Sequence, residues 1–209
     1  YWYENIPVIS YILLKGRCSG CGKKISWVYP TIEITTALFA FLIAPKEFSS
    51  AAVFNFLFFF SIFCAFVVHF VVDLKHQILP DSVNVYLACL FAVVGFYTSA
   101  WTHWLLGGAL GFGFPLIVSW IFYKLKGQIG LGGGDIKLYG ALGLYLGPIG
   151  VMQNLFLSCF LGALTGIALI ATKAIKRDNP IPFGPFILLV AAVQIFAEDW
   201  FRHLISYIP

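Results

Sequence analysis

The sequence has few charged residues: Asp, Glu, Lys and Arg make up only 11% of its 209 residues. Soluble domains contain about 25% charged residues, so this composition excludes a single water-soluble core. Hydrophobic residues account for 60% of the chain and aromatic residues for 18%, and the mean hydropathy is +0.90. We therefore expect a polytopic membrane protein. The placement of basic residues along the chain explains the net charge of +4, so we expect no nucleic-acid partner.

Cysteine is scarce as well. The five cysteines are too few and too scattered for a disulfide framework. Cys18 and Cys21 form the single C-x-x-C pair, which lies in a basic loop and supplies two of the four ligands that a tetrahedral zinc site needs. Two explanations stay open: either the missing zinc ligands lie upstream of Tyr1, or the pair is a redox dithiol.

Several familiar signals are missing. We expect no cleavable signal peptide in residues 1–26, because they are polar, aromatic and basic. The chain starts at Tyr1 instead of Met, so we expect the natural chain to begin further upstream. The glycine run at 132–134 is not a phosphate-binding loop, because no Lys-Ser or Lys-Thr follows it.

Seven hydrophobic segments make up most of the chain. All should be helices, because an open strand edge in lipid would leave backbone groups unpaired. The sequence therefore predicts an all-α, polytopic helical membrane protein. We expect a cytoplasmic, cysteine-containing segment at 1–26 and a transmembrane helical domain at 27–209. The seven segments cover residues 27–44, 51–72, 83–100, 105–123, 136–146, 151–172 and 183–197.

The basic residues test this division. If the N-terminal segment is cytoplasmic and the segments alternate across the membrane, 11 of the 13 basic residues lie on the cytoplasmic side. Only Lys46 and Arg202 fall on the other side, and such asymmetry is what the positive-inside rule predicts.

Two aspartates lie at the ends of apolar segments, Asp73 in VVDLKHQILPD and Asp135 in GLGGGDIKL. An ionisable group at membrane depth is costly, so a functional site is its default interpretation. The alternation places both aspartates on the cytoplasmic side, although neither was used to set the topology. Two carboxyl groups at one site suggest a dyad that shares a proton, as in aspartyl proteolysis. Simpler roles stay open, with Asp73 as an interfacial cap and Asp135 as a helix N-cap.

Glycine and proline surround these aspartates. Gly132, Gly133 and Gly134 would leave room for an extended substrate peptide, because glycine allows another chain to approach closely. The fifth segment, 136–146, would be only about 16 Å long as a helix, against a hydrocarbon core of about 30 Å. Within and after it, Gly143 and Gly147 form a G-x-x-x-G spacing that lets helices approach closely.

Three further features each have two interpretations. His69 lies one helical turn before Asp73 and either tunes that carboxyl group or hydrogen-bonds a neighbouring helix, and we favour the second. Glu33 is either interfacial or a polar contact near the site. The Pro-Phe-Gly-Pro run at 182–185 is either a turn between helices or a rim of the substrate entrance.

Five stretches, in this order, resemble the type IV prepilin leader peptidase family: WYENIPVISYILLKGRCSGC, YPTIEITT, VVDLKHQILPD, GLGGGDIKL and IPFGPF. The likeness runs from Tyr1 to about Pro185. It implies an intramembrane aspartyl protease with a G-x-G-D motif. Gly132, Gly134 and Asp135 occupy that motif, and Asp73 is implied to be the other catalytic aspartate.

The resemblance also implies partners and cofactors. The substrates would be prepilins, or pseudopilins of type II secretion, whose apolar segment docks in membrane lipid. The cut would fall at the cytoplasmic face of the bacterial inner membrane, between a basic leader ending in Gly and a hydrophobic helix usually starting with Phe. Proteolysis would need no cofactor, whereas many members also N-methylate the new terminus with S-adenosylmethionine.

One departure from the family pattern matters. Bifunctional members usually carry two zinc-binding C-x-x-C pairs after an extra N-terminal transmembrane helix. Cys18 and Cys21 match only the second pair, so zinc binding and methylation stay open. No G-x-G-x-x-G in a strand–turn–helix context offers a site for the methyl donor.

Together these features predict general acid–base hydrolysis without a covalent intermediate. The main alternative is a proton-coupled membrane transporter with buried carboxylates. Two observations disfavour it: the chain has no pair of matching broken helices, and both aspartates fall at one face instead of the midplane. A structural membrane subunit, with the aspartates as caps, is the second alternative.

Overall fold

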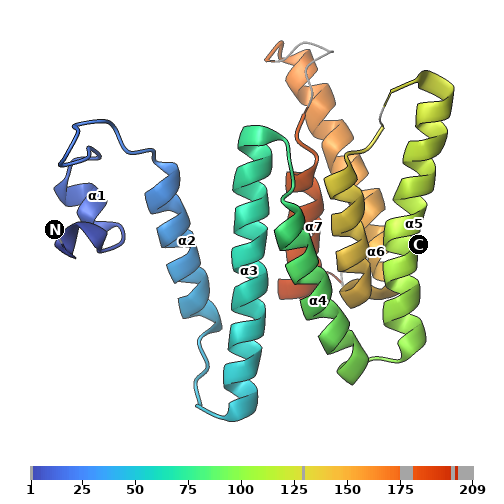
Figure 1. Cartoon of the computed structure of the whole chain (residues 1–209), viewed down its shortest axis with the longest axis horizontal. Helices are drawn as coiled ribbons and strands as arrows, with labels where there is room; N and C mark the ends of the chain where they lie inside the picture. Colours follow the sequence, from blue (N-terminus) through green and yellow to red (C-terminus); the bar gives the residue numbers. More distant parts are fainter. Residues whose placement is uncertain (1, 129, 175–180, 199–200, 202–209) are drawn as a thin grey trace. The chain divides into compact units, whose positions relative to one another are not determined.

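The computed structural model describes residues 2–128, 130–174, 181–198 and 201. All of the regular structure in these residues is helical, apart from one isolated bridge between Arg17 and Lys24. The all-α prediction is therefore confirmed. The elements, labelled in Figure 1, are η1 (Trp2–Asn5), α1 (Ile9–Leu13), α2 (Val28–Ile43), α3 (Ser50–His76), α4 (Asp81–Thr98), α5 (Trp101–Lys126), α6 (Gly133–Ala171) and α7 (Gly184–Phe196).

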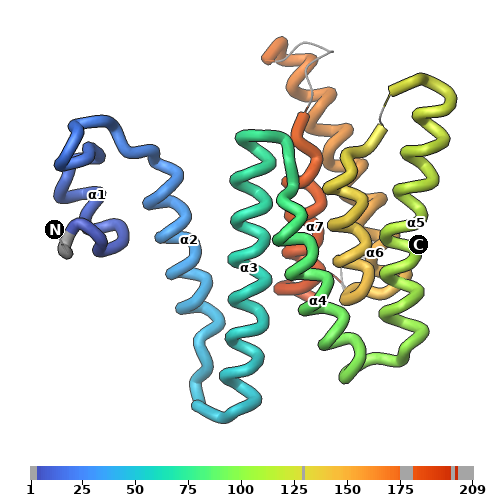
Figure 2. The backbone as a smooth tube through the Cα atoms, viewed as in Figure 1, coloured from blue at the N-terminus to red at the C-terminus, as the bar shows by residue number. Residues whose placement is uncertain are grey.

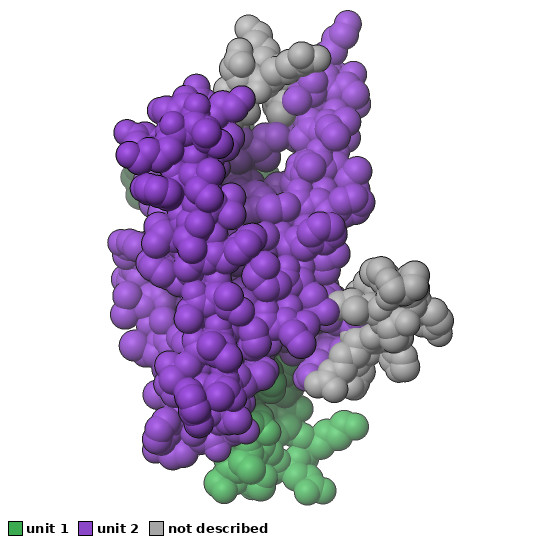
Figure 3. Space-filling model, turned by 90° about the vertical axis from the view of Figure 1, so that its right-hand side faces the viewer, with its two compact units in different colours: residues 1–67 green, residues 68–209 purple. Residues whose placement is uncertain are grey.

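The chain divides into two compact units, Tyr1–Val67 and Val68–Pro209, which Figure 3 distinguishes by colour. The boundary falls inside α3, so the N-terminal part of this helix belongs to the first unit and its last turns to the second. Both predicted catalytic aspartates belong to the second unit.

Among the described residues, four helices are long and apolar enough to cross a membrane, namely α3, α4, α5 and α6, with 27, 18, 26 and 39 residues. The apolar helices α2 and α7 are shorter. The seven predicted segments correspond to α2 to α7, because the fifth and sixth segments are the two parts of α6. The difference in bounds that matters for the site is at α3, which continues past Val72 to His76 and so takes Asp73 into its last turn.

Within the second unit, α5 and α6 lie side by side, as the backbone trace in Figure 2 shows. Their backbones touch at glycines: a Cβ added to Gly107 would overlap the carbonyl oxygen of Gly143, and one added to Gly111 would overlap that of Tyr139. The close approach predicted from the Gly143 and Gly147 spacing is thus present, and its partner is α5.

Helix α6 is broken at Gly147, whose φ of 70° and ψ of −177° are not helical. Glycine is needed there because other residues rarely adopt positive φ, and Pro148 follows without a backbone N–H. Helix α7 holds the second half of α6 through buried amides. Asn154 Nδ2 donates to Gln194 Oε1 at 2.8 Å, and Gln194 Nε2 donates to the Gly150 carbonyl at 2.9 Å.

The first unit carries the cysteine pair in a tight turn. The Cys18 N–H donates to the Lys23 carbonyl, and the Gly22 N–H donates back to the Cys18 carbonyl, both at 2.9 Å. Glu33 of α2 also lies in the first unit, and its Oε2 accepts a hydrogen bond from the Val8 N–H at 2.6 Å. Glu33 therefore connects α2 to the start of α1, a contact that neither interpretation of the sequence includes.

Candidate active site

Asp73 lies in the last turn of α3, and only 4% of its surface is exposed. Its Oδ2 accepts a hydrogen bond from the backbone N–H of Gly184, the first residue of α7, at 3.0 Å. A buried carboxyl group needs such a partner, because leaving it without one would be expensive. Its burial also argues against the interpretation of Asp73 as a cap exposed to lipid headgroups.

Asp135 lies at the start of α6, where Gly132 is the N-cap and Asp135 the third helical residue. The alternative of Asp135 as the N-cap is therefore wrong. Its carboxyl group instead reaches back to accept a hydrogen bond from the Gly132 backbone, as the acidic member of a capping box does. This contact orients the side chain and still leaves it half-buried at the surface of a cavity.

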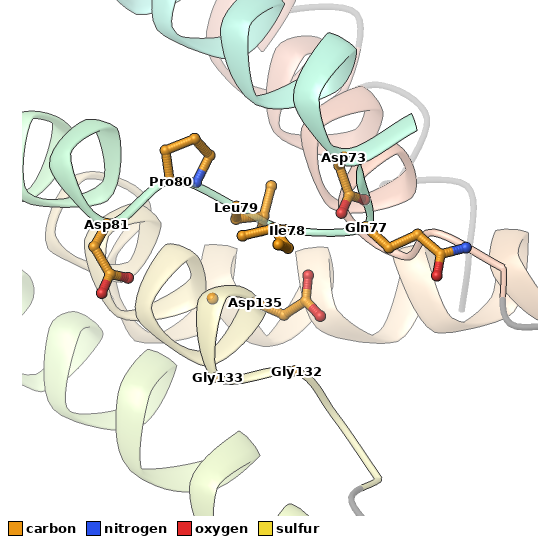
Figure 4. Close-up of a pocket in the computed structure, with 10 residues that line it drawn as sticks. Asp73, Gln77, Ile78, Leu79, Pro80, Asp81, Gly132, Gly133 and Asp135 are labelled. Atoms are coloured by element: carbon orange, nitrogen blue, oxygen red, sulfur yellow. The ribbon is translucent and has the colours of Figure 1, made fainter. Parts of the chain in front are cut away.

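The two aspartates line one cavity of about 440 Å³. Figure 4 shows them approaching it from different elements, Asp73 from the end of α3 and Asp135 from the start of α6. They are close enough for their charges to interact. The cavity wall is completed by the loop after α3, the first residue of α4 and the glycine run: Gln77, Ile78, Leu79, Pro80, Asp81, Gly132, Gly133 and Gly134.

The three glycines differ in their surroundings. A Cβ added to Gly134 would lie 2.9 Å from Leu79 Cβ, so this residue packs against the loop after α3. A Cβ added to Gly133 would meet no atom of the described residues within 4 Å, so Gly133 borders open space. A Cβ on Gly132 would lie 2.9 Å from Asp135 Oδ2. All three line the cavity, and substrate binding by them stays a prediction.

His69 lies one turn before Asp73 and is fully buried against Asn84 of α4. The favoured interpretation is a hydrogen bond to a neighbouring helix; the ring lies against such a helix, and the hydrogen bond itself stays a prediction. Neither ring nitrogen of His69, nor Asn84 Oδ1, makes a well-formed hydrogen bond within the described part of the chain. Asn84 Nδ2 donates to the Gly134 carbonyl at 3.3 Å. The pair therefore links the helix of Asp73 to the glycine next to Asp135.

Sequence reasoning missed two contributors to this site. Asn84 could not be identified from the sequence, because a single asparagine in an apolar helix belongs to no recognisable motif. Gly184 lies within the Pro-Phe-Gly-Pro run at 182–185, for which the sequence predicts a turn or a rim, but the sequence does not indicate its contact with Asp73. Asp81, at the edge of the cavity, is half of an exposed ion pair with Lys137 Nζ at 2.7 Å.

The cysteine pair is part of the first unit. Hydrogen bonds from the backbone N–H groups of Cys21 and Gly20 lower the pKa of the Cys18 thiol, which favours the thiolate that zinc prefers. However, the described residues contain no group of three or more side chains placed to hold a metal ion. Cys18 and Cys21 thus suit two positions of a zinc site and do not complete one.

Comparisons with known proteins match nearly the whole chain. A model of the type IV leader peptidase family matches residues 58–167, and one of the bacterial peptidase A24 N-terminal domain matches residues 1–46. No solved structure gives a significant match.

Three similar curated proteins are each named prepilin leader peptidase/N-methyltransferase. The protein of Xanthomonas campestris pv. campestris is 33% identical over 93% of this chain and 68% of its own length. That of Aeromonas salmonicida is 34% identical, with 94% and 67% covered, and that of Bacillus subtilis is 32% identical, with 98% and 79% covered.

Proposed function

The chain belongs to the type IV leader peptidase family, and on this basis we propose that it is a membrane aspartic endopeptidase that removes the leader from prepilins or pseudopilins. The observation that carries the proposal is the meeting of Asp73 and Asp135 at one cavity, from helices far apart in the chain. The four apolar helices of membrane-spanning length in the part of the chain that the structure describes support a location in the bacterial inner membrane.

The proposed chemistry follows from two neighbouring carboxyl groups, which cannot both ionise cheaply. One is ionised and takes a proton from a water molecule, whose oxygen attacks the scissile carbonyl carbon. The other is protonated and donates to the carbonyl oxygen. When the C–N bond breaks, a proton passes to the leaving amine and the pair regains its starting charge. The Gly184 N–H holds Asp73 in orientation, and which of the two acids begins protonated is a property of the pair.

We further propose that the cut lies at the cytoplasmic face, after a glycine that ends a basic leader. The open space beside Gly133 would admit the extended backbone of the substrate. The apolar segment of the substrate would remain in lipid. The names of the relatives support N-methylation with S-adenosylmethionine as a second activity, and zinc at Cys18 and Cys21 would then stabilise the first unit.

The test is cleavage of a co-expressed prepilin by Asp73→Asn and Asp135→Asn variants, read as the mass of the product. Each should abolish cleavage, because asparagine can neither accept nor supply the proton, while the protein remains in the membrane. Asp81→Asn is the matched control: Asp81 lines the same cavity but is 65% exposed, and loss of its ion pair should leave cleavage close to normal. Retained cleavage in either of the first two variants would contradict the dyad.

A further inference from the structure

A second cavity in the same unit, of about 260 Å³, lies between α5, α6 and the residue before α7. We call it the side pocket. Most of its walls are apolar, with Phe114, Val118 and Phe122 from α5 facing Leu131 and Phe183. Such a lining favours an apolar ligand, because a polar group placed there would lose its hydrogen bonds to water.

The two hydroxyl groups that line the side pocket, those of Tyr139 and Ser119, already have partners. Tyr139 OH and Ser158 Oγ share a hydrogen bond of 2.6 Å, and Tyr139 is fully buried. Ser119 Oγ lies 3.4 Å from both the N–H and the carbonyl oxygen of Leu131. Neither hydroxyl group is left to select a polar ligand, so shape and apolar contact would decide what the pocket accepts.

Three links in the chain join the side pocket to the cavity of the two aspartates. Leu131 in its wall directly precedes Gly132, which lines the aspartate cavity. Phe183 directly precedes Gly184, which holds Asp73. Tyr139 lies one helical turn after Asp135 on α6, close enough for the two groups to interact electrostatically.

We propose that the side pocket binds the apolar side chain of the substrate residue that directly follows the scissile bond. The inference rests on the proposed function, in which that residue begins the apolar segment of the substrate. When the scissile carbonyl group of a peptide lies between the aspartates, the side chain of the next residue begins within a few ångströms of that carbonyl group, since consecutive Cα atoms are about 3.8 Å apart. The pocket therefore contributes to substrate selection, with Val118 and Phe114 as specificity-determining residues.

The test compares two substrates, with Phe or Ala after the scissile bond, in membranes that contain the full chain. Val118→Trp would fill the pocket and should lower the ratio of Phe to Ala cleavage about tenfold, the scale of discrimination in apolar pockets. Ile117→Trp is the matched control, because this neighbouring residue is 58% exposed and does not line the pocket. Its ratio should equal that of the wild type. Because each ratio is measured within one preparation, loss of folded protein cancels out.

Phe114→Ala provides a second measurement, since it widens the pocket and should raise the relative cleavage of a substrate with Trp at the same position. Equal effects on all substrates would overturn the proposal and would fit a pocket filled by a lipid chain. An equal change of ratio in Ile117→Trp would also overturn it. Wild-type protein that cuts no prepilin would defeat the proposed function itself, and the inference with it, whereas unchanged ratios alongside normal cleavage would defeat only the side pocket.

Discussion

The two units of the chain each carry residues suited to chemistry, but they hold them in opposite ways. In the first unit, the turn of Cys18 and Cys21 is closed by backbone hydrogen bonds between residues no more than five apart. In the second, Asp73 depends on a hydrogen bond from Gly184, 111 residues further along the chain. A local turn survives changes elsewhere, whereas a site assembled from distant elements is sensitive to each of them.

The largest effect short of removing an aspartate is expected at Gly184. A Cβ there would lie 2.6 Å from Asp73 Oδ2, so Gly184→Ala must displace the carboxyl group. We expect a loss of at least about 100-fold in the rate of prepilin cleavage, because a shift of about 1 Å can cost this much. Gly20→Ala in the cysteine turn is the control, since no described atom lies within 4 Å of its Cβ. Similar losses in both would break the contrast between the units.

The glycine run offers a matched pair with a smaller expected effect. Gly134→Ala would push against Leu79 Cβ at 2.9 Å and so move the turn that carries Asp135. We expect cleavage to fall about tenfold or more, because misplaced catalytic groups act slowly. Gly133→Ala should leave the fold unchanged, because its Cβ meets no described atom within 4 Å, but it should also lower cleavage, because the methyl group would enter the space proposed for the substrate backbone. Unchanged cleavage in this variant would contradict that placement of the substrate. If Gly133→Ala were the more harmful, direct contact of Gly133 with substrate would explain it better than packing.

His69 tests how the second unit is held together. His69→Leu would remove the imidazole that lies against Asn84 and change the shape of a fully buried side chain, and such changes in a packed interior cost about 1–3 kcal/mol. We expect a lower thermal unfolding temperature in detergent and a moderate loss of cleavage. The double variant with Asn84→Leu should be less unstable than the two single effects added together. Strict additivity would show that the two side chains do not act as a pair.

The smallest effect on proteolysis is expected from the first unit. Cys18→Ser should leave cleavage of the prepilin nearly unchanged, because neither cysteine lines the cavity of the aspartates. If the protein binds zinc, elemental analysis should show its loss in this variant, and methylation of the product should fall with it. A large loss of cleavage would mean that the two units are functionally coupled.

Much of the fold could be predicted from the sequence, because apolar segments in lipid have little choice but to form helices. The fold class and the family resemblance are both confirmed. The positions of the aspartates at helix ends could also be predicted from the sequence, since ionisable residues are rare in apolar segments and mark their ends. The catalytic role of Asp73 and Asp135, the cytoplasmic orientation and the division at residue 26 stay predictions.

The missed features share one physical cause: they are contacts between residues that are distant in the chain and individually unremarkable. The N–H of Gly184 and the amide of Asn84 matter only because folding brings them to Asp73 and His69. Similarly, the G-x-x-x-G spacing indicated that something would pack closely on α6, but Gly107 of α5 could not be identified as the partner.

The contact between the glycine backbones of α5 and α6 bears on how a peptide could reach the aspartates. Where two backbones touch, neither helix can move closer to the other. The helix that carries Asp135 is therefore held directly against α5. The parts of the cavity wall that are not helical, residues 77–80 and Gly132, are better able to adjust their backbones when a peptide enters.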